Sequence, residues 1–223
     1  MRRRGLSGAA CIEFAFATMT LVPLLLGTGA AGINMIETLQ TIQLARDAGH
    51  MYARGLDFSQ PGNQTILADI GSTLGLSSTA GSGTAVVILS SLTYVDNAAC
   101  TAAGAVDKNG NPSGCTNLGK WVFTQRLEIG NSAVRTSNIG SPLTSGPTGV
   151  TVDATTGRIS VVDYVTKAGA VATFTGINPY SDVNGTVSGL PSGQMLYIAE
   201  ASADAFSMPP FIGPHATYSY GLF

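Results

Sequence analysis

The feature that most constrains this chain is an uninterrupted run of 23 uncharged residues, 14–36, near its N-terminus. As a helix with a rise of about 1.5 Å per residue, this run would be roughly 34 Å long, enough to cross a hydrocarbon core about 30 Å thick. Carboxylates border it on both sides, because Glu13 precedes it and Glu37 follows it. The run predicts one membrane-spanning helix.

The flanking charges predict the direction of this helix. Arg2, Arg3 and Arg4 precede the run, and no Lys or Arg follows it until Arg46. Because positive charge is retained on the cytoplasmic side of a membrane, the N-terminus should lie in the cytoplasm and the chain after residue 36 outside it.

Glu13 is the unusual residue of this segment. A carboxylate costs on the order of 2 to 3 kcal/mol at the centre of a bilayer and less near its surface, so a functional role with a partner is the first interpretation. The alternative is that Glu13 lies at the headgroup level, where it costs little. A secretory signal peptide cut near Ala30 is another reading, but its apolar core is normally about 7 to 15 residues, shorter than this run.

A basic leader that ends at Gly8, followed by Ala9, Glu13 and Phe14, resembles the start of type IV pilin-like proteins. Within that family, the chain resembles the TadE-like pseudopilins of tight-adherence (Tad/Flp) pilus systems. The resemblance is strong over the first quarter of the chain and weak at its C-terminal end. Further TadE-like residues are Pro23 to Gly27, Leu39-Gln40, Ala45 to Ala48, Tyr52 to Gly55 and Met208 to Phe211.

The resemblance implies a structural role and no enzymatic activity. A prepilin peptidase would cut after Gly8, so that Ala9 becomes the first residue and Glu13 the fifth. Glu13 would pair with the new amino terminus of a neighbouring subunit, because a charge left unpaired in a low dielectric is costly. The implied partners are the peptidase, other pilin or pseudopilin subunits, the pilus assembly platform and membrane lipid, at the bacterial inner membrane and possibly in an extracellular pilus.

Two other classes of function remain open. One is an unprocessed single-span envelope protein whose outer β domain binds a ligand or a surface. The other is an extracytoplasmic enzyme released by signal peptidase.

The composition suits an extracytoplasmic domain. Only 11% of the residues are charged and 28 are glycine, which favours a β-rich domain with many loops. After residue 55, six basic residues face ten acidic ones. Because nucleic-acid binding requires clustered Lys and Arg, we expect no nucleic-acid partner.

The cysteines agree with the predicted topology. Cys100 and Cys115 flank a turn-rich loop, and a disulfide between them would close about 16 residues and contribute roughly 3 kcal/mol. An oxidising compartment outside the cytoplasm permits this bridge. Two unrelated thiols are the alternative, and Cys11 is expected to be a small side chain facing lipid or a helix.

Beyond the span, apolar residues keep a helical period, and Gly55 is a natural helix end. Pro23 should kink the helix. A second helix is expected at 63–75, with Ile66, Leu67, Ile70 and Leu74 on one face, and a flexible Ser/Thr/Gly connection at 76–83. The apolar residues that predict an amphipathic continuation of the membrane helix over 33–54 are Ile33, Ile36, Leu39, Ile42 and Leu44.

The rest of the chain predicts strands. Residues 121–129 alternate apolar and polar side chains, which is typical of a half-buried strand. Further strands are expected at 85–95, 171–174 and 195–199, with a hairpin from 150–152 to 159–165, and loops at 138–148 and 178–192. The fold class is therefore α+β, organised as a leader at 1–8, a transmembrane and stalk helix at 9–55, and an extracytoplasmic domain with a short second helix and an antiparallel sheet at 56–223.

Signals for catalysis or cofactors are weak. Residues 27–32 match G-x-G-x-x-G, but Pro23 would interrupt the parallel strand that a dinucleotide site needs. His50 and His215 are the only histidines, and neither lies in a known catalytic motif. Asp107 begins a calcium-loop-like pattern that lacks the required glycine and final acid, so it is read as a turn former. No cofactor or metal is expected.

Overall fold

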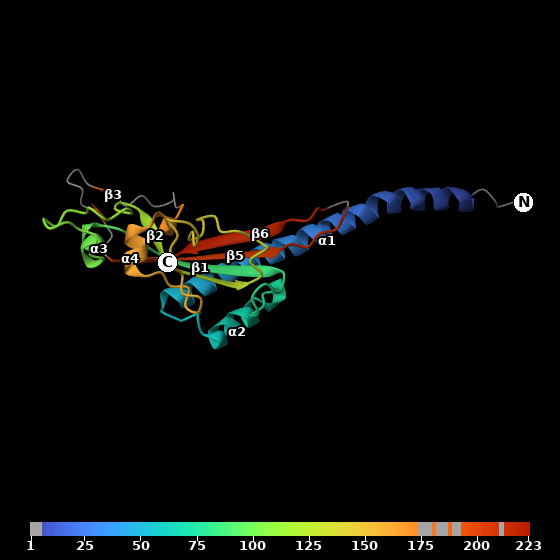
Figure 1. Ribbon diagram of the computed structural model, residues 1–223. Coiled ribbons are helices and arrows are strands. Elements are labelled where there is room, and N and C mark those ends of the chain that lie inside the picture. Colours follow the sequence, from blue (N-terminus) through green and yellow to red (C-terminus); the bar gives the residue numbers. More distant parts are fainter. Residues whose placement is uncertain (1–5, 174–179, 182–186, 189–192, 210–211) are drawn as a thin grey trace, which may run out of the picture.

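The computed structural model describes residues 6–173, 180–181, 187–188, 193–209 and 212–223. Within these residues it has a long N-terminal helix, a few short helices and a four-stranded antiparallel sheet, which confirms the α+β class (Figure 1). The basic cluster at residues 2–4 lies outside the described residues.

Helix α1 is continuous over Leu6–Ala53. It ends at Gly55, as expected: the φ of Gly55 is +86°, a left-handed conformation that glycine adopts at least cost, and its N–H donates to the Tyr52 carbonyl at 2.9 Å. The N-terminal half of α1 projects beyond the rest of the protein (Figure 1). The helix also changes direction in this half, which contains Pro23, in keeping with the bend that a proline imposes.

The main sheet has the strand order β2-β1-β5-β6, and each neighbouring pair is antiparallel. The sequence predicted β1 and β2 closely, predicted only the first half of β5, and missed β6. The strands are β1 (Ala85–Tyr94), β2 (Trp121–Gly130), β5 (Met195–Asp204) and β6 (Ala216–Leu222). A small second sheet pairs β3 (Tyr180–Ser181) with β4 (Val187–Ser188), and the rest of the loop expected at 178–192 lies mainly outside the described residues.

One face of the sheet packs against the C-terminal half of α1. Ala45 and Ala48 of the helix are fully buried there. They share a core with three alanines that alternate along β5, so helix and strand meet through small side chains and can approach closely. This core also contains Leu44, Tyr52, Phe58, Leu67, Val87, Leu89, Ile129, Ala199, Ala201 and Ala203.

The helix continues beyond the apolar run as expected, but of the apolar residues that predicted its amphipathic face only Leu44 is buried. The others are open to solvent: Ile33, Ile36, Leu39 and Ile42 are exposed by 43%, 57%, 54% and 36%. The buried stripe instead consists mainly of small or polar residues, which let the helix approach the alanines of β5, together with the larger Leu44 and Tyr52. It comprises Ala30, Thr41, Leu44, Ala45, Ala48, Gly49 and Tyr52.

The opposite face of the sheet is covered by the chain between β2 and α4. Strand β2 is therefore buried on both faces as far as Arg126, where the expected half-buried strand is wrong: Val122, Thr124 and Arg126 are buried, and only Glu128 of the predicted outer face is exposed. The β1–β2 pairing shifts register between Ser91 and Leu92. Because a bulge changes the face to which later side chains point, β2 contributes to two cores.

The hairpin expected at 150–165 is only partly present. Val152 and Ile159 form an isolated bridge, but the chain then forms helix α4 (Val161–Thr166) instead of a strand. Ser160 caps this helix, since its side chain accepts a hydrogen bond from the Asp163 N–H at 3.2 Å. The cap outweighs the strand preference of the valines. The strand expected at 171–174 is reduced to a bridge at Val171, and residue 174 lies outside the described residues.

The second helix is shorter than expected. Helix α2 (Pro61–Ile70) stops at Gly71 and is followed by the 3-10 turn η1 (Ser72–Leu74). Leu67 and Leu74 are buried, whereas Ile66 and Ile70 are about half exposed, so the expected four-residue face is wrong for the isoleucines.

The connection at 76–83 is closed by a Leu76–Gly83 bridge. Two short elements were not expected: α3 (Asn97–Ala102) and η2 (Ala168–Ala170).

A buried carboxylate holds the covering chain on the sheet. Glu200 is 1% exposed and lies on the face opposite α1. It accepts hydrogen bonds from the Asn138 N–H at 2.9 Å, from the Tyr218 hydroxyl at 2.7 Å and from the Ser137 hydroxyl, and Arg126 Nη1 lies 4.0 Å away. Burial, together with the hydrogen bond to Glu200, raises the pKa of Tyr218.

We predict that Glu200→Gln lowers the free energy of unfolding by about 2 to 4 kcal/mol, because the buried amide cannot accept from all the donors and Arg126 loses one of its two nearby carboxylates, the other being Glu128 at 3.5 Å. Urea unfolding of the detergent-solubilised chain, followed by Trp121 fluorescence, measures this loss. Glu128→Gln is the matched control: its side chain is 39% exposed, so the loss should stay below about 1 kcal/mol. Equal losses in the two variants would contradict the structural role of Glu200.

Candidate functional site

The residues that the sequence places in processing and assembly all lie in the first turns of α1. Gly8, Ala9, Glu13 and Phe14 are exposed, and Phe14 reaches 70%. Among the described residues, the Glu13 carboxylate has neither a hydrogen-bond donor nor an ion-pair partner. The Glu13 carboxylate is therefore exposed on the surface of α1.

The surroundings of Gly8 leave its backbone accessible. A Cβ atom at this position would meet nothing within 4 Å, so packing within the chain does not require a glycine here. The described part of α1 starts at Leu6, two residues before Gly8.

The spacing of Ala9 and Glu13 places them on one face of the helix. Positions four residues apart are neighbours, separated by about 6 Å along the axis. An amino terminus created at Ala9 would be unfavourable beside the positive end of the helix dipole, whereas a carboxylate in the first turns is favourable there. The arrangement could therefore neutralise an amine at residue 9, from the same chain or from a neighbour.

The helix after Glu13 has a continuous apolar surface. Phe16 and Met19 are exposed by 69% and 75%, and the protein buries none of the most apolar 18-residue window of α1. The hydroxyls of Thr18 and Thr28 donate to carbonyls of their own helix, so they need no water. By length and composition, α1 can cross a membrane. The G-x-G-x-x-G match lies inside this helix and follows no strand, which removes the dinucleotide-site reading.

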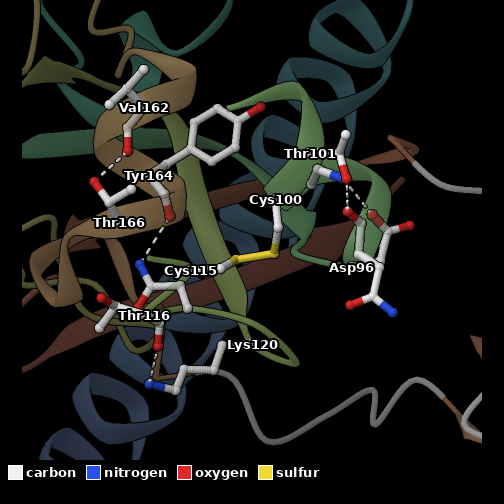
Figure 2. The surroundings of a disulfide bond; sticks show 12 residues. Asp96, Cys100, Thr101, Cys115, Thr116, Lys120, Val162, Tyr164 and Thr166 are labelled. Atoms are coloured by element: carbon white, nitrogen blue, oxygen red, sulfur yellow. Dashed lines mark hydrogen bonds between the residues drawn. A yellow bond between two sulfur atoms is a disulfide. The ribbon is translucent and has the colours of Figure 1, made fainter. Parts of the chain in front are cut away.

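The bridge expected between Cys100 and Cys115 is present, with the two Cα atoms 5.6 Å apart, so the reading as unrelated thiols is wrong. Figure 2 shows it joining α3 to the chain that leads into β2, with Tyr164 of α4 beside it. Cys11 is a free, exposed thiol on α1.

Asn117 holds the bridged loop against α4, and no sequence signal indicated this. It is fully buried, and its Nδ2 donates to the carbonyls of Tyr164 and Lys167 at 2.9 and 2.7 Å. The Thr151 N–H donates to Asp163 at 2.7 Å and is the main reason that the pKa of this carboxyl is lowered. Helix α4 is thus held by two neighbouring segments, through the side chain of Asn117 and through the backbone of Thr151.

The other polar candidates have structural roles. Asp107 is a turn former, as expected: its carboxylate accepts from the N–H groups of Asn109 and Asn111 at 2.8 Å, which lowers its pKa. The ring of His50 packs edge-on against Phe223, and His215 lies at the other end of β6. In the described part of the chain, no group of three or more His, Cys, Asp or Glu residues could hold a metal ion.

Two adjoining hollows lie near the C-terminal end of α1, and the sequence did not reveal them. They have volumes of about 280 and 110 Å³ and share Gln125, Arg158 and Tyr197. Tyr52 at their edge donates to Gln125 at 2.8 Å, and burial raises the pKa of Tyr52 to about 12. Each hollow is smaller than the roughly 300 Å³ at which small-molecule sites usually begin.

Comparison of the chain with protein-family models, with curated proteins and with solved structures finds no match. Its function therefore has to be inferred from its own residues and contacts.

We predict that Cys100→Ser/Cys115→Ser lowers the free energy of unfolding by about 3 kcal/mol, because the bridge no longer restricts a 16-residue loop in the unfolded chain. Urea unfolding measures the loss, and Cys11→Ser should leave stability unchanged. Alkylation followed by mass spectrometry provides an independent check. Without reductant the unfolded wild-type chain should take up one label, at Cys11, and after reduction three; three labels without reductant would contradict the bridge.

Proposed function

We propose that this protein is a minor pilin or pseudopilin that assembles through the N-terminal part of α1 and helps to initiate or build a Tad/Flp-type pilus or a related secretion filament. The observation that supports this most is Glu13: an exposed carboxylate without a partner in the described chain, five residues after Gly8 and directly before an open apolar helix.

The energetics of a membrane favour an intermolecular partner for this acid. A carboxylate close to hydrocarbon is tolerated best when a positive charge compensates it. After removal of residues 1–8, the amine of Ala9 on an adjacent subunit would supply that charge. The exposed apolar surface that follows Glu13 would then pack against lipid and against the spans of other subunits.

The proposed topology follows from the flanking charges. The arginines at residues 2–4 keep the leader in the cytoplasm, where a prepilin peptidase would cut it, and the sheet lies outside the inner membrane. The disulfide is compatible with that compartment. Since α1 continues from the apolar segment into the core, assembly of the spans would also position the outer domains.

Processing gives the first test. When the full chain is produced together with a prepilin peptidase, mass spectrometry should find a protein that begins at Ala9, and without the peptidase it should find the leader intact. Gly8→Val should block the cut, because a β-branched side chain is placed at the scissile bond. Gly5→Val changes another leader glycine and should be cut normally. An intact leader in the presence of active peptidase would refute the processing step.

Assembly gives the second test. Glu13→Gln removes the charge but keeps the size of the side chain, so the amount of pilus recovered by shearing should fall at least about tenfold, since an unpaired charge in a low dielectric is costly. Glu37→Gln is the matched control at the other border of the apolar run and should assemble normally, because glutamine can still accept a hydrogen bond. Normal pilus yield from Glu13→Gln would contradict the proposal.

A second candidate function keeps the membrane span but assigns the outer domain to ligand binding, without processing at Gly8. The two adjoining hollows favour it, because the polar side chains of Gln125, Arg158 and Tyr197 line both of them. Uncut protein with a functional Glu13→Gln variant would support this candidate over the first.

A further inference from the structure

We propose that the link between β5 and β6 contacts the outer surface of the membrane beside the span, so that the protein touches lipid with its sheet domain as well as with α1. The described parts of this link are residues 205–209 and 212–215. The inference rests on the proposed membrane insertion of α1, but it does not depend on processing or on pilus assembly.

Three contacts fix the position of the link along α1. The Phe206 N–H donates to the Glu37 carboxylate at 2.8 Å, the hydroxyls of Thr217 and Thr41 are 2.7 Å apart, and Phe223 packs on His50. Strand β6 therefore runs beside the helix in the same direction, and the link lies at the end nearer to the apolar segment. Figure 1 shows the link lying alongside α1 and pointing toward its projecting N-terminal half.

The position of Glu37 sets the depth of the link. The apolar run is centred on Leu25, and Glu37 lies 12 residues further on, about 18 Å along the axis, just beyond the roughly 15 Å half-thickness of the hydrocarbon core. Phe206 is at this level. The buried stripe of α1 continues past Glu37 to Ala30, which is 3% exposed and about 10 Å nearer to the centre of the membrane.

The chemistry of the link suits this depth. The sequence has no charged residue between Asp204 and His215, and Phe206 is 36% exposed. Met208 and Ile212 pair through two backbone hydrogen bonds of 2.9 Å, so these polar groups need no water. A hollow of about 440 Å³, lined by Asp204, Ser207 and His215 among others, lies at the base of the link, where polar headgroups would be.

Lipid is the occupant that the geometry favours. Phe206 lies beside Glu37, where the uncharged run ends, and Ile36, the last residue of that run, is exposed by 57%. Apolar and aromatic side chains at the membrane surface are stabilised by partial burial among the headgroups. Once α1 is inserted, membrane is present at this level.

Tryptophan reporters test the contact in the full chain reconstituted into vesicles. Trp121→Phe serves as the background, so that the introduced tryptophan is the one observed. The fluorescence of Phe206→Trp should be quenched strongly by lipids brominated near the headgroup end of the acyl chain and weakly by lipids brominated near the methyl end of the chain. Leu24→Trp, at the middle of the run, should show the reverse order. Leu118→Trp, near the disulfide and remote from the membrane, should be quenched by neither.

The outcomes separate the two proposals. If Leu24→Trp is quenched and Phe206→Trp is not, the link does not contact lipid, although the span stands. If neither is quenched, α1 is not inserted and the membrane location fails as well. Ser207→Trp gives a second reporter on the link, and a far-UV circular dichroism spectrum and a urea-unfolding midpoint equal to those of the wild type confirm that each variant is folded.

Discussion

The packing of α1 on β5 is the contact on which the rest of the structure depends. Alanines at alternate positions of β5 face Ala45 and Ala48 of the helix, so the two backbones approach closely and the sheet is held on one side of α1. A larger side chain in this interface would separate them, because a well-packed core does not absorb extra volume without strain. The same requirement leaves the bulky apolar residues of α1 on its outer surface.

The carboxylates of the protein differ in how they are compensated. Glu200 is buried and has several donors, and Glu37 receives the Phe206 N–H. Glu13 alone among these three has no partner in the described chain. The two carboxylates that contact the sheet domain are thus compensated within the chain, whereas the acid at the start of the apolar helix is not, and that contrast is why the proposed function centres on it.

The sequence predicted elements whose signals are local. The apolar run, Gly55 and the alternation along β2 identified α1, its end and a strand, and the spacing of Cys100 and Cys115 identified the disulfide. The errors concern tertiary contacts. The buried face of α1 depends on the alanines of a strand more than 140 residues away, and β2 is covered on its second face by chain that carries no periodic signal. The capping role of Ser160 and the burial of Asn117 likewise depend on local hydrogen bonds that composition does not reveal.

The continuity of α1 has a mechanical consequence. Its 48 residues extend over about 72 Å with a bend in the half that contains Pro23, and the sheet is fixed to the other half by direct packing. A tilt or rotation of α1 would therefore move the sheet as one body. Small changes in the angle between neighbouring α1 helices would produce large displacements of the sheet domains attached to them.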